Sequence, residues 1–143
     1  MKKVCLLVLL LFSISGCTKI DHTSYSYPTN GDLLISHYLD VGQADSIFIE
    51  LPNHEVILID AGEKKSSEKI IQYIKDLGYE KINYVIATHP HADHIGGMKD
   101  VIESFEIGNI YMPKVAATSK TYENLLLAIK DKNLKIHTGC AGI

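Results

Sequence analysis

The stretch "KINYVIATHPHADHIGG", Lys81 to Gly97, joins an apolar run to a cluster of metal-ligating side chains and a pair of glycines. The run through Ala87 is rich in β-branched and aromatic residues, which predicts a buried strand. Three histidines and one aspartate follow within six residues. Zinc prefers imidazole and carboxylate ligands, and a catalytic site needs them where substrate can reach. The stretch therefore predicts a strand that delivers a metal site at its carboxyl end.

Hydrophobic patterns predict the elements on both sides of this stretch. Strand-like runs that meet at a Pro52-Asn53 corner predict an antiparallel meander over residues 33–60. Apolar residues at helical spacing predict one helix that is capped by Ser66 or Ser67 and closed by Gly78. The remaining predictions are a helix over residues 95–105, a strand over 107–112, a helix over 121–133 and a strand over 134–138. Together they predict an α/β (α+β) domain, a mixed sheet with helices on one face.

The first residues have the pattern of an export signal. A basic lead, Met1 to Lys3, precedes an apolar stretch from Val4 to Ile14, which is too short to span a bilayer as a helix. We therefore expect residues 1–16 to be a signal peptide, residues 17–30 a flexible polar tether, and residues 31–143 the domain. Without Lys2 and Lys3 the formal charge changes from −3 to −5. Such a chain has no basic surface for nucleic acid.

"ISGC", which ends at Cys17, resembles a bacterial lipobox. The resemblance implies that Cys17 is lipidated and becomes the N-terminus of the mature chain. Several acyl chains would hold the protein stably on the extracytoplasmic side of the cell membrane. The alternatives are an uncleaved anchor and a chance cysteine.

The spacing of the ligand cluster predicts how it binds metal. Residues two apart in an extended segment point to the same side, so His89 and His91 can bind one ion together. A helix that starts near Asp93 would turn Asp93 and His94 toward a second position, and two ions roughly 3.5–4 Å apart could share a hydroxide. The alternative is a polar loop with fortuitous metal affinity. His37, His54 and His137 are predicted to be ordinary strand or loop residues.

"HPHADHIGG" resembles the signature of the metallo-β-lactamase superfamily, and "LDVGQADSIFIELPNHEVILIDAG" resembles the opening of its ComEC-type branch, which includes proteins of DNA uptake. The resemblance implies that His89 and His91 bind the first ion and that Asp93 and His94 bind the second. It also implies that Asp93 lies beside the attacking hydroxide and that Asp60 supports the ligands from behind. From the residues alone, Asp60 is equally a turn cap before Gly62.

The family fold implied by this resemblance is a four-layer αβ/βα sandwich of two similar halves, and this sequence matches the N-terminal half. The resemblance implies that the second half supplies further ligands, so the chain is expected to be truncated before that half. A half-sandwich would expose an apolar sheet face. A homodimer or a complementary fragment could then supply the missing half.

The function implied by the resemblance is hydrolysis by a metal-bound hydroxide, with zinc as the expected metal and manganese or iron as alternatives. A phosphodiester is the first substrate class to consider, as a small molecule or within nucleic acid, and other esters remain open. The alternative is an inactive surface lipoprotein or binding module that keeps a residual metal site. Whether the chain is an enzyme stays open at this point, because the second-half ligands are missing.

Overall fold

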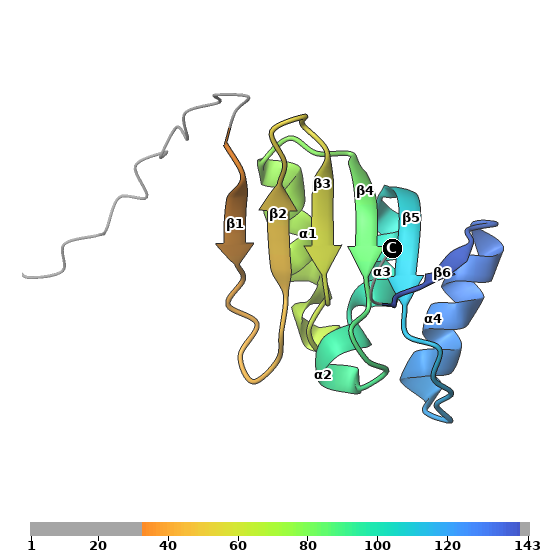
Figure 1. The fold of residues 1–143 in the computed structure, drawn as a ribbon. Helices are drawn as coiled ribbons and strands as arrows, with labels where there is room; N and C mark the ends of the chain where they lie inside the picture. Colours follow the sequence, from red (N-terminus) through yellow and green to blue (C-terminus); the bar gives the residue numbers. More distant parts are fainter. Residues whose placement is uncertain (1–32, 141–143) are drawn as a thin grey trace, which may run out of the picture.

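The computed structural model describes residues 33–140, which form one mixed sheet of six strands in the order β1-β2-β3-β4-β5-β6 (Figure 1). The strands are β1 (Ile35–Tyr38), β2 (Ile47–Glu50), β3 (Val56–Ile59), β4 (Lys81–Ile86), β5 (Glu106–Met112) and β6 (Ile136–Thr138). The helices are the 3-10 turn η1 (Lys64–Ser66), α1 (Ser67–Asp76), α2 (Ala92–Ile95), α3 (Met98–Ser104) and α4 (Lys120–Asp131). The expected signal peptide, residues 1–16, and the expected tether, residues 17–30 with Cys17, lie outside these residues.

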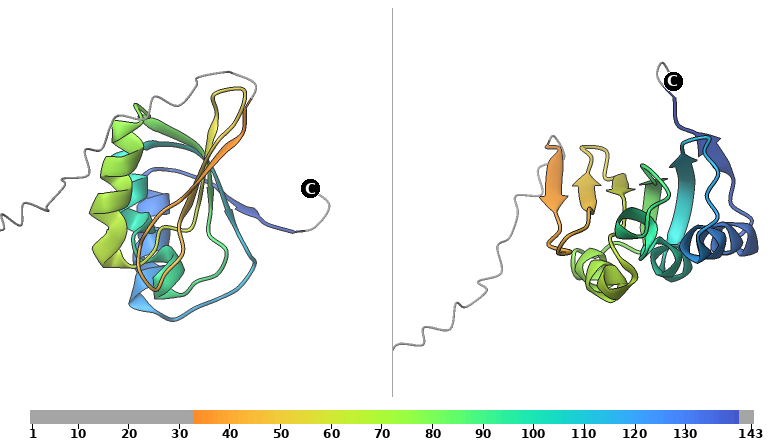
Figure 2. Two further views of the ribbon diagram at one scale, coloured as in Figure 1. Left: turned by 90° about the vertical axis from the view of Figure 1, so that its left-hand side faces the viewer. Right: turned by 90° about the horizontal axis from the view of Figure 1, so that it is seen from below.

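The sheet changes direction after its first three strands. β1, β2 and β3 pair antiparallel, which confirms the predicted meander, whereas β3, β4, β5 and β6 pair parallel. Parallel neighbours need a crossover, and α1, the α2–α3 segment and α4 provide the three crossovers. All of them lie on the same face of the sheet (Figure 2). The predicted fold class is therefore confirmed.

The core fills the space between the sheet and its helices. Alternate residues of the central strands, Phe48, Val56 and Leu58, are fully buried on the helix side. Ile70 and Ile74, one helical turn apart on α1, are buried against them. Burial of a large aliphatic or aromatic side chain contributes about 1.5–3 kcal/mol, so this two-layer core holds the meander and the crossovers together.

The opposite face of the sheet is also apolar. Strand register aligns one row across all six strands, which consists of Tyr38, Ile47, Ile59, Ile86, Tyr111 and His137. Helices cover only the other face (Figure 2), and nothing within residues 33–140 forms a second layer over this row. The structure thus has the exposed apolar sheet face that the sequence predicted. No helix in this part of the chain is long and apolar enough to cross a membrane.

Two helix predictions differ from the structure. Ser66 is at the predicted N-cap position of α1, but its side chain makes no capping hydrogen bond. The Ser67 hydroxyl donates to the Lys64 carbonyl at 2.9 Å. The predicted helix over residues 95–105 is two short helices, α2 and α3, separated at Gly96 and Gly97. Hydrophobic spacing continues through this break, which explains why the pattern alone predicted one helix.

A polar network lies beneath β1 and β2. His37 is buried and contacts the Tyr73 hydroxyl and a Glu50 carboxylate oxygen, both at 2.8 Å. The Tyr79 hydroxyl donates to the other Glu50 oxygen. Burial and this hydrogen bond together raise the pKa of Tyr79 to about 12. The network therefore holds Tyr79 in its neutral form.

Tyr79→Phe should lose a stabilising contribution that depends on pH. The folded-state pKa lies above the unfolded value of about 10, so the contribution is complete below that pH and is lost as the pH rises toward about 12. Urea unfolding at about pH 8 and about pH 11 should show the difference between wild type and variant shrinking at the higher pH. Tyr38→Phe, at an exposed tyrosine, is the matched control. An equal difference at both pH values would contradict this account.

Candidate metal centre

The histidine cluster lies at the carboxyl end of β4, between that strand and α2. The chain leaves the sheet after Ile86 and bends at His89-Pro90, and α2 begins at Ala92. His91 is the N-cap residue of α2 and is extended, with φ −92° and ψ 152°. The helix turn then places Asp93 and His94 beside the extended segment, as the sequence predicted for a helix that starts near Asp93.

Three of the predicted ligands form one group. Ligand atoms of His89, His91 and Asp93 all lie within 4.8 Å of one another. An ion bound at about 2.0–2.1 Å in tetrahedral geometry keeps its ligand atoms roughly 3.4 Å apart, so small side-chain rotations would close the group around it. The resemblance assigned Asp93 to the second ion, but in this geometry Asp93 also faces the position between His89 and His91.

His94 is held by a buried carboxylate. Its Nδ1 lies 2.7 Å from Oδ2 of Asp60, whose side chain is only 4% exposed. The Thr88 backbone N–H donates to Oδ1 of Asp60 at 2.9 Å, and the Thr88 hydroxyl donates to Oδ2 at 2.5 Å. A carboxylate that accepts from Nδ1–H fixes the neutral ring in the tautomer whose Nε2 carries a lone pair. Asp60 therefore leaves Nε2 of His94 available to a metal ion.

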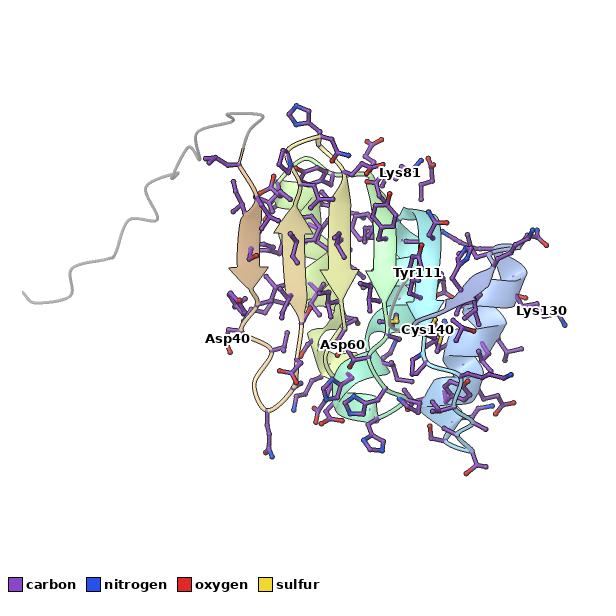
Figure 3. The ribbon with its side chains drawn as sticks, viewed as in Figure 1. Asp40, Asp60, Lys81, Tyr111, Lys130 and Cys140 are labelled. Carbon is purple, nitrogen blue, oxygen red and sulfur yellow. The ribbon has the colours of Figure 1, made fainter. Side chains whose placement is uncertain are left out.

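The backbone of Asp60 joins the strands around the site. Asp60 has a positive φ of 55°, which turns the chain sharply after β3. Its N–H donates to the Ile86 carbonyl at 2.9 Å, and its carbonyl accepts from the Ser46 hydroxyl at 3.1 Å. Figure 3 shows Asp60 at the end of β3 from which the chain continues toward α1. Asp60 is thus a turn residue through its backbone and a contact of the histidine cluster through its side chain.

Close backbone packing fixes α2 against the loop that follows β3. The Ala61 N–H donates to the His94 carbonyl at 2.7 Å, and the Gly97 N–H donates to the Gly62 carbonyl at 3.1 Å. A Cβ atom on Gly97 would lie 2.4 Å from the Ala61 carbonyl oxygen, and one on Gly96 would lie 2.6 Å from the Lys64 nitrogen. Both positions therefore require glycine for the helix to approach so closely.

The donor set fits a divalent metal ion. Imidazole nitrogen with carboxylate oxygen is a zinc set, and manganese or iron also accept it. Within residues 33–140, no lysine or arginine forms an ion pair with Asp45, Asp60 or Asp93. The centre therefore combines several carboxylates with imidazole rings and no paired lysine, which favours a cation between them.

The structure leaves the other histidines outside this centre. His37 is enclosed by the polar network under β1, and His54 occupies the turn between β2 and β3 with a positive φ of 63°. His137 is on edge strand β6, paired in register with Tyr111, and stacks on that ring with centroids 5.2 Å apart.

Sequence analysis missed two residues near the cluster. Thr88 lies within the quoted stretch, but its contacts with Asp60 depend on a strand pairing between β3 and β4 that no local pattern shows. Asp45 lies in the quoted stretch "LDVGQADSIFIELPNHEVILIDAG", which predicts no contact with the histidine cluster, and its carboxylate lies 3.6 Å from Nε2 of His94. Both contacts join segments that are far apart in the sequence.

Comparison with known families identifies the class. Residues 39–136 match the family model described as the metallo-beta-lactamase superfamily. The matched span begins after β1 and includes β2, β3, the histidine cluster and all three crossovers. The chain therefore belongs to the metallo-β-lactamase superfamily.

Individual relatives match over parts of their length. The chain is 36% identical over 75 residues to the probable metallo-hydrolase YflN of Bacillus subtilis, covering 50% of this chain and 28% of that protein. It is 26% identical over 115 residues to ComE operon protein 3 of Bacillus subtilis, covering 68% and 15%. It is 30% identical over 73 residues to ribonuclease J of Mycoplasma pneumoniae, covering 45% and 13%. The chain thus spans less than a third of each of these relatives.

A solved structure of a metallo-β-lactamase with a HARLDQ motif from Cronobacter sakazakii is also similar. Its TM-score is 0.47 at 28% sequence identity, over 55% of this chain and 30% of that one.

Asp60→Asn should weaken metal binding by about 10–100-fold, the usual effect of losing a carboxylate behind a ligand histidine. An amide has one acceptor oxygen and one donor NH2 end, so it cannot accept from the Thr88 N–H at one end and from the Thr88 hydroxyl and His94 at the other. Asparagine also tolerates the positive φ, so the backbone is preserved. Competition titration with a zinc chelator measures the change, and exposed Asp131→Asn is the control. Unchanged affinity in Asp60→Asn would contradict the assignment.

Proposed function

We propose that this protein is a metal-dependent hydrolase that acts on phosphodiesters or related esters. The observation that carries the proposal is the convergence of His89, His91 and Asp93 at the open end of β4, with His94 oriented beside them by buried Asp60. A hydrolytic site needs open ligands for the substrate to reach and rigid support behind them, and this centre has both.

The residues of the centre have different proposed roles, which depend on how exposed each side chain is. When bound, zinc supplies a Lewis acid and lowers the pKa of a coordinated water. His89 and His91 would hold the ion in their neutral forms. The Asp93 side chain is 49% exposed, so it can reach both the ion and an incoming water, accept a proton from that water and orient it. Asp60 is too buried to meet substrate and acts through His94.

The relatives support the reaction class. One is named a probable metallo-hydrolase, and another is a ribonuclease, which cleaves phosphodiester bonds. The match to ComE operon protein 3 supports a place in the ComEC-type branch. With a formal net charge of −3, the chain has no general attraction for nucleic acid, so binding of a phosphodiester would depend on the metal centre.

The geometry favours a hydrolase over a binding module. A buried carboxylate that fixes the tautomer of an imidazole beside an exposed aspartate is arranged for proton transfer at a metal ion, which passive binding does not require. We also propose that Cys17 is lipidated and anchors the protein outside the cell. The mass of the mature N-terminal peptide tests that part separately.

His89→Ala should abolish metal-dependent hydrolysis of a generic phosphodiester such as bis(p-nitrophenyl) phosphate. The variant loses a ligand that no neighbouring side chain replaces, so the bound metal should fall with the turnover. Elemental analysis and the assay, on the same purified protein with zinc or manganese supplied, measure both quantities. His137→Ala is the matched control, because that histidine lies on edge strand β6 and should keep metal and turnover at wild-type levels.

Unchanged metal content in His89→Ala would refute the site. A wild-type protein that binds metal through His89 but never turns over a phosphodiester would favour the binding module.

A further inference from the structure

The loop between β1 and β2 brings a third carboxylate, that of Asp45, to the metal centre beside Asp60 and Asp93. The Asp45 N–H donates to the Asp93 carbonyl at 3.2 Å, and the Asp45 carbonyl accepts from the Gly62 N–H at 2.9 Å. The backbone of Asp45 is therefore fixed between α2 and the loop after β3. Its side chain is 72% exposed, so its carboxylate is accessible to solvent beside the other ligands.

Three acceptor atoms converge here without a donor. Because Nδ1 of His94 donates to Asp60, the neutral ring presents a lone pair at Nε2. Carboxylate oxygens of Asp45 and Asp93 each lie 3.6 Å from this nitrogen. The hydrogen bonds formed within residues 33–140 include none to either carboxylate, so mutual repulsion of the three acceptors is not relieved by a protein donor.

The spacing fits a shared ion better than an ion pair. Hydrogen-bonded ion pairs of protonated histidine have N···O distances of about 2.7–3.2 Å, and 3.6 Å is longer than that. Two ligands of a tetrahedral ion at about 2.0–2.1 Å are roughly 3.4 Å apart, which is close to the distance observed on both sides of Nε2.

We propose that Asp45 is a metal ligand, and that it completes a second ion position with Asp93 and His94. This inference rests on the proposed metal-dependent function. Asp93 would be shared between this position and the position formed by His89 and His91. The ring centroids of these two histidines lie 4.7 Å apart. The His89 and His94 rings are also adjacent, with centroids 3.7 Å apart, so the two ion positions would be neighbours, as in a binuclear centre.

Asp40 provides a matched control in the same loop. Asp40 is also an exposed aspartate, but its carboxylate faces the Lys69 ammonium at 3.3 Å and the Gly42 N–H at 3.4 Å. Figure 3 shows Asp40 below β1, away from Asp60. Replacing either aspartate by asparagine removes the same charge, and only Asp45 faces His94.

The test is zinc titration of the complete chain by calorimetry, for wild type, Asp45→Asn and Asp40→Asn. Cobalt spectra of the same proteins report the number of ligands independently of turnover. We expect two ions in wild type and in Asp40→Asn. In Asp45→Asn the second ion should bind at least about tenfold more weakly, with the first ion unchanged.

Equal affinity of both ions in Asp45→Asn and Asp40→Asn would overturn the inference, and so would a wild-type chain that binds a single ion. The hydrolase function would still stand in either case if His89→Ala lost both a bound ion and turnover. The two ideas therefore fail separately.

Discussion

The hydrogen bonds of the Asp60 carboxylate are the constraint on which the site depends. One buried side chain at the end of β3 accepts from the backbone and hydroxyl of Thr88 and from the His94 ring. The turn before the histidine cluster and the helix after it are thus fixed to the same atoms. A buried carboxylate without donors would cost several kcal/mol, so the fold keeps Thr88 and His94 in place to satisfy it.

The position of the site follows from the sheet topology. β3 and β4 are parallel, so their carboxyl ends lie at the same edge of the sheet, where the backbone turns away and leaves side chains open. Sites of open α/β sheets form at this edge for that reason. The antiparallel β1–β2 hairpin has its loop at the same edge, and this loop contains Asp45.

Local patterns in the sequence predicted the strands and placed the histidine cluster after β4. Strand-like runs around the Pro52-Asn53 corner predicted the meander, and the two-residue spacing of His89 and His91 predicted that they approach each other, because both depend on neighbours in the chain. The break at Gly96-Gly97 was not predicted, since it results from close packing on the Lys64 and Ala61 backbone. The approach of Asp45 to His94 was not predicted either, because it is a contact between segments that are distant in the sequence.

The central claim is that Asp60 fixes His94 with Nδ1 protonated and Nε2 free for metal. Long-range proton–nitrogen NMR correlation spectra of the histidine rings at neutral pH test it directly, before and after zinc is added. The account predicts that metal-free His94 is the Nδ1–H tautomer and that zinc shifts its Nε2 resonance. A metal-free His94 ring protonated at Nε2 instead of Nδ1 would contradict the account. So would nitrogen resonances of His94 that do not shift when zinc is added.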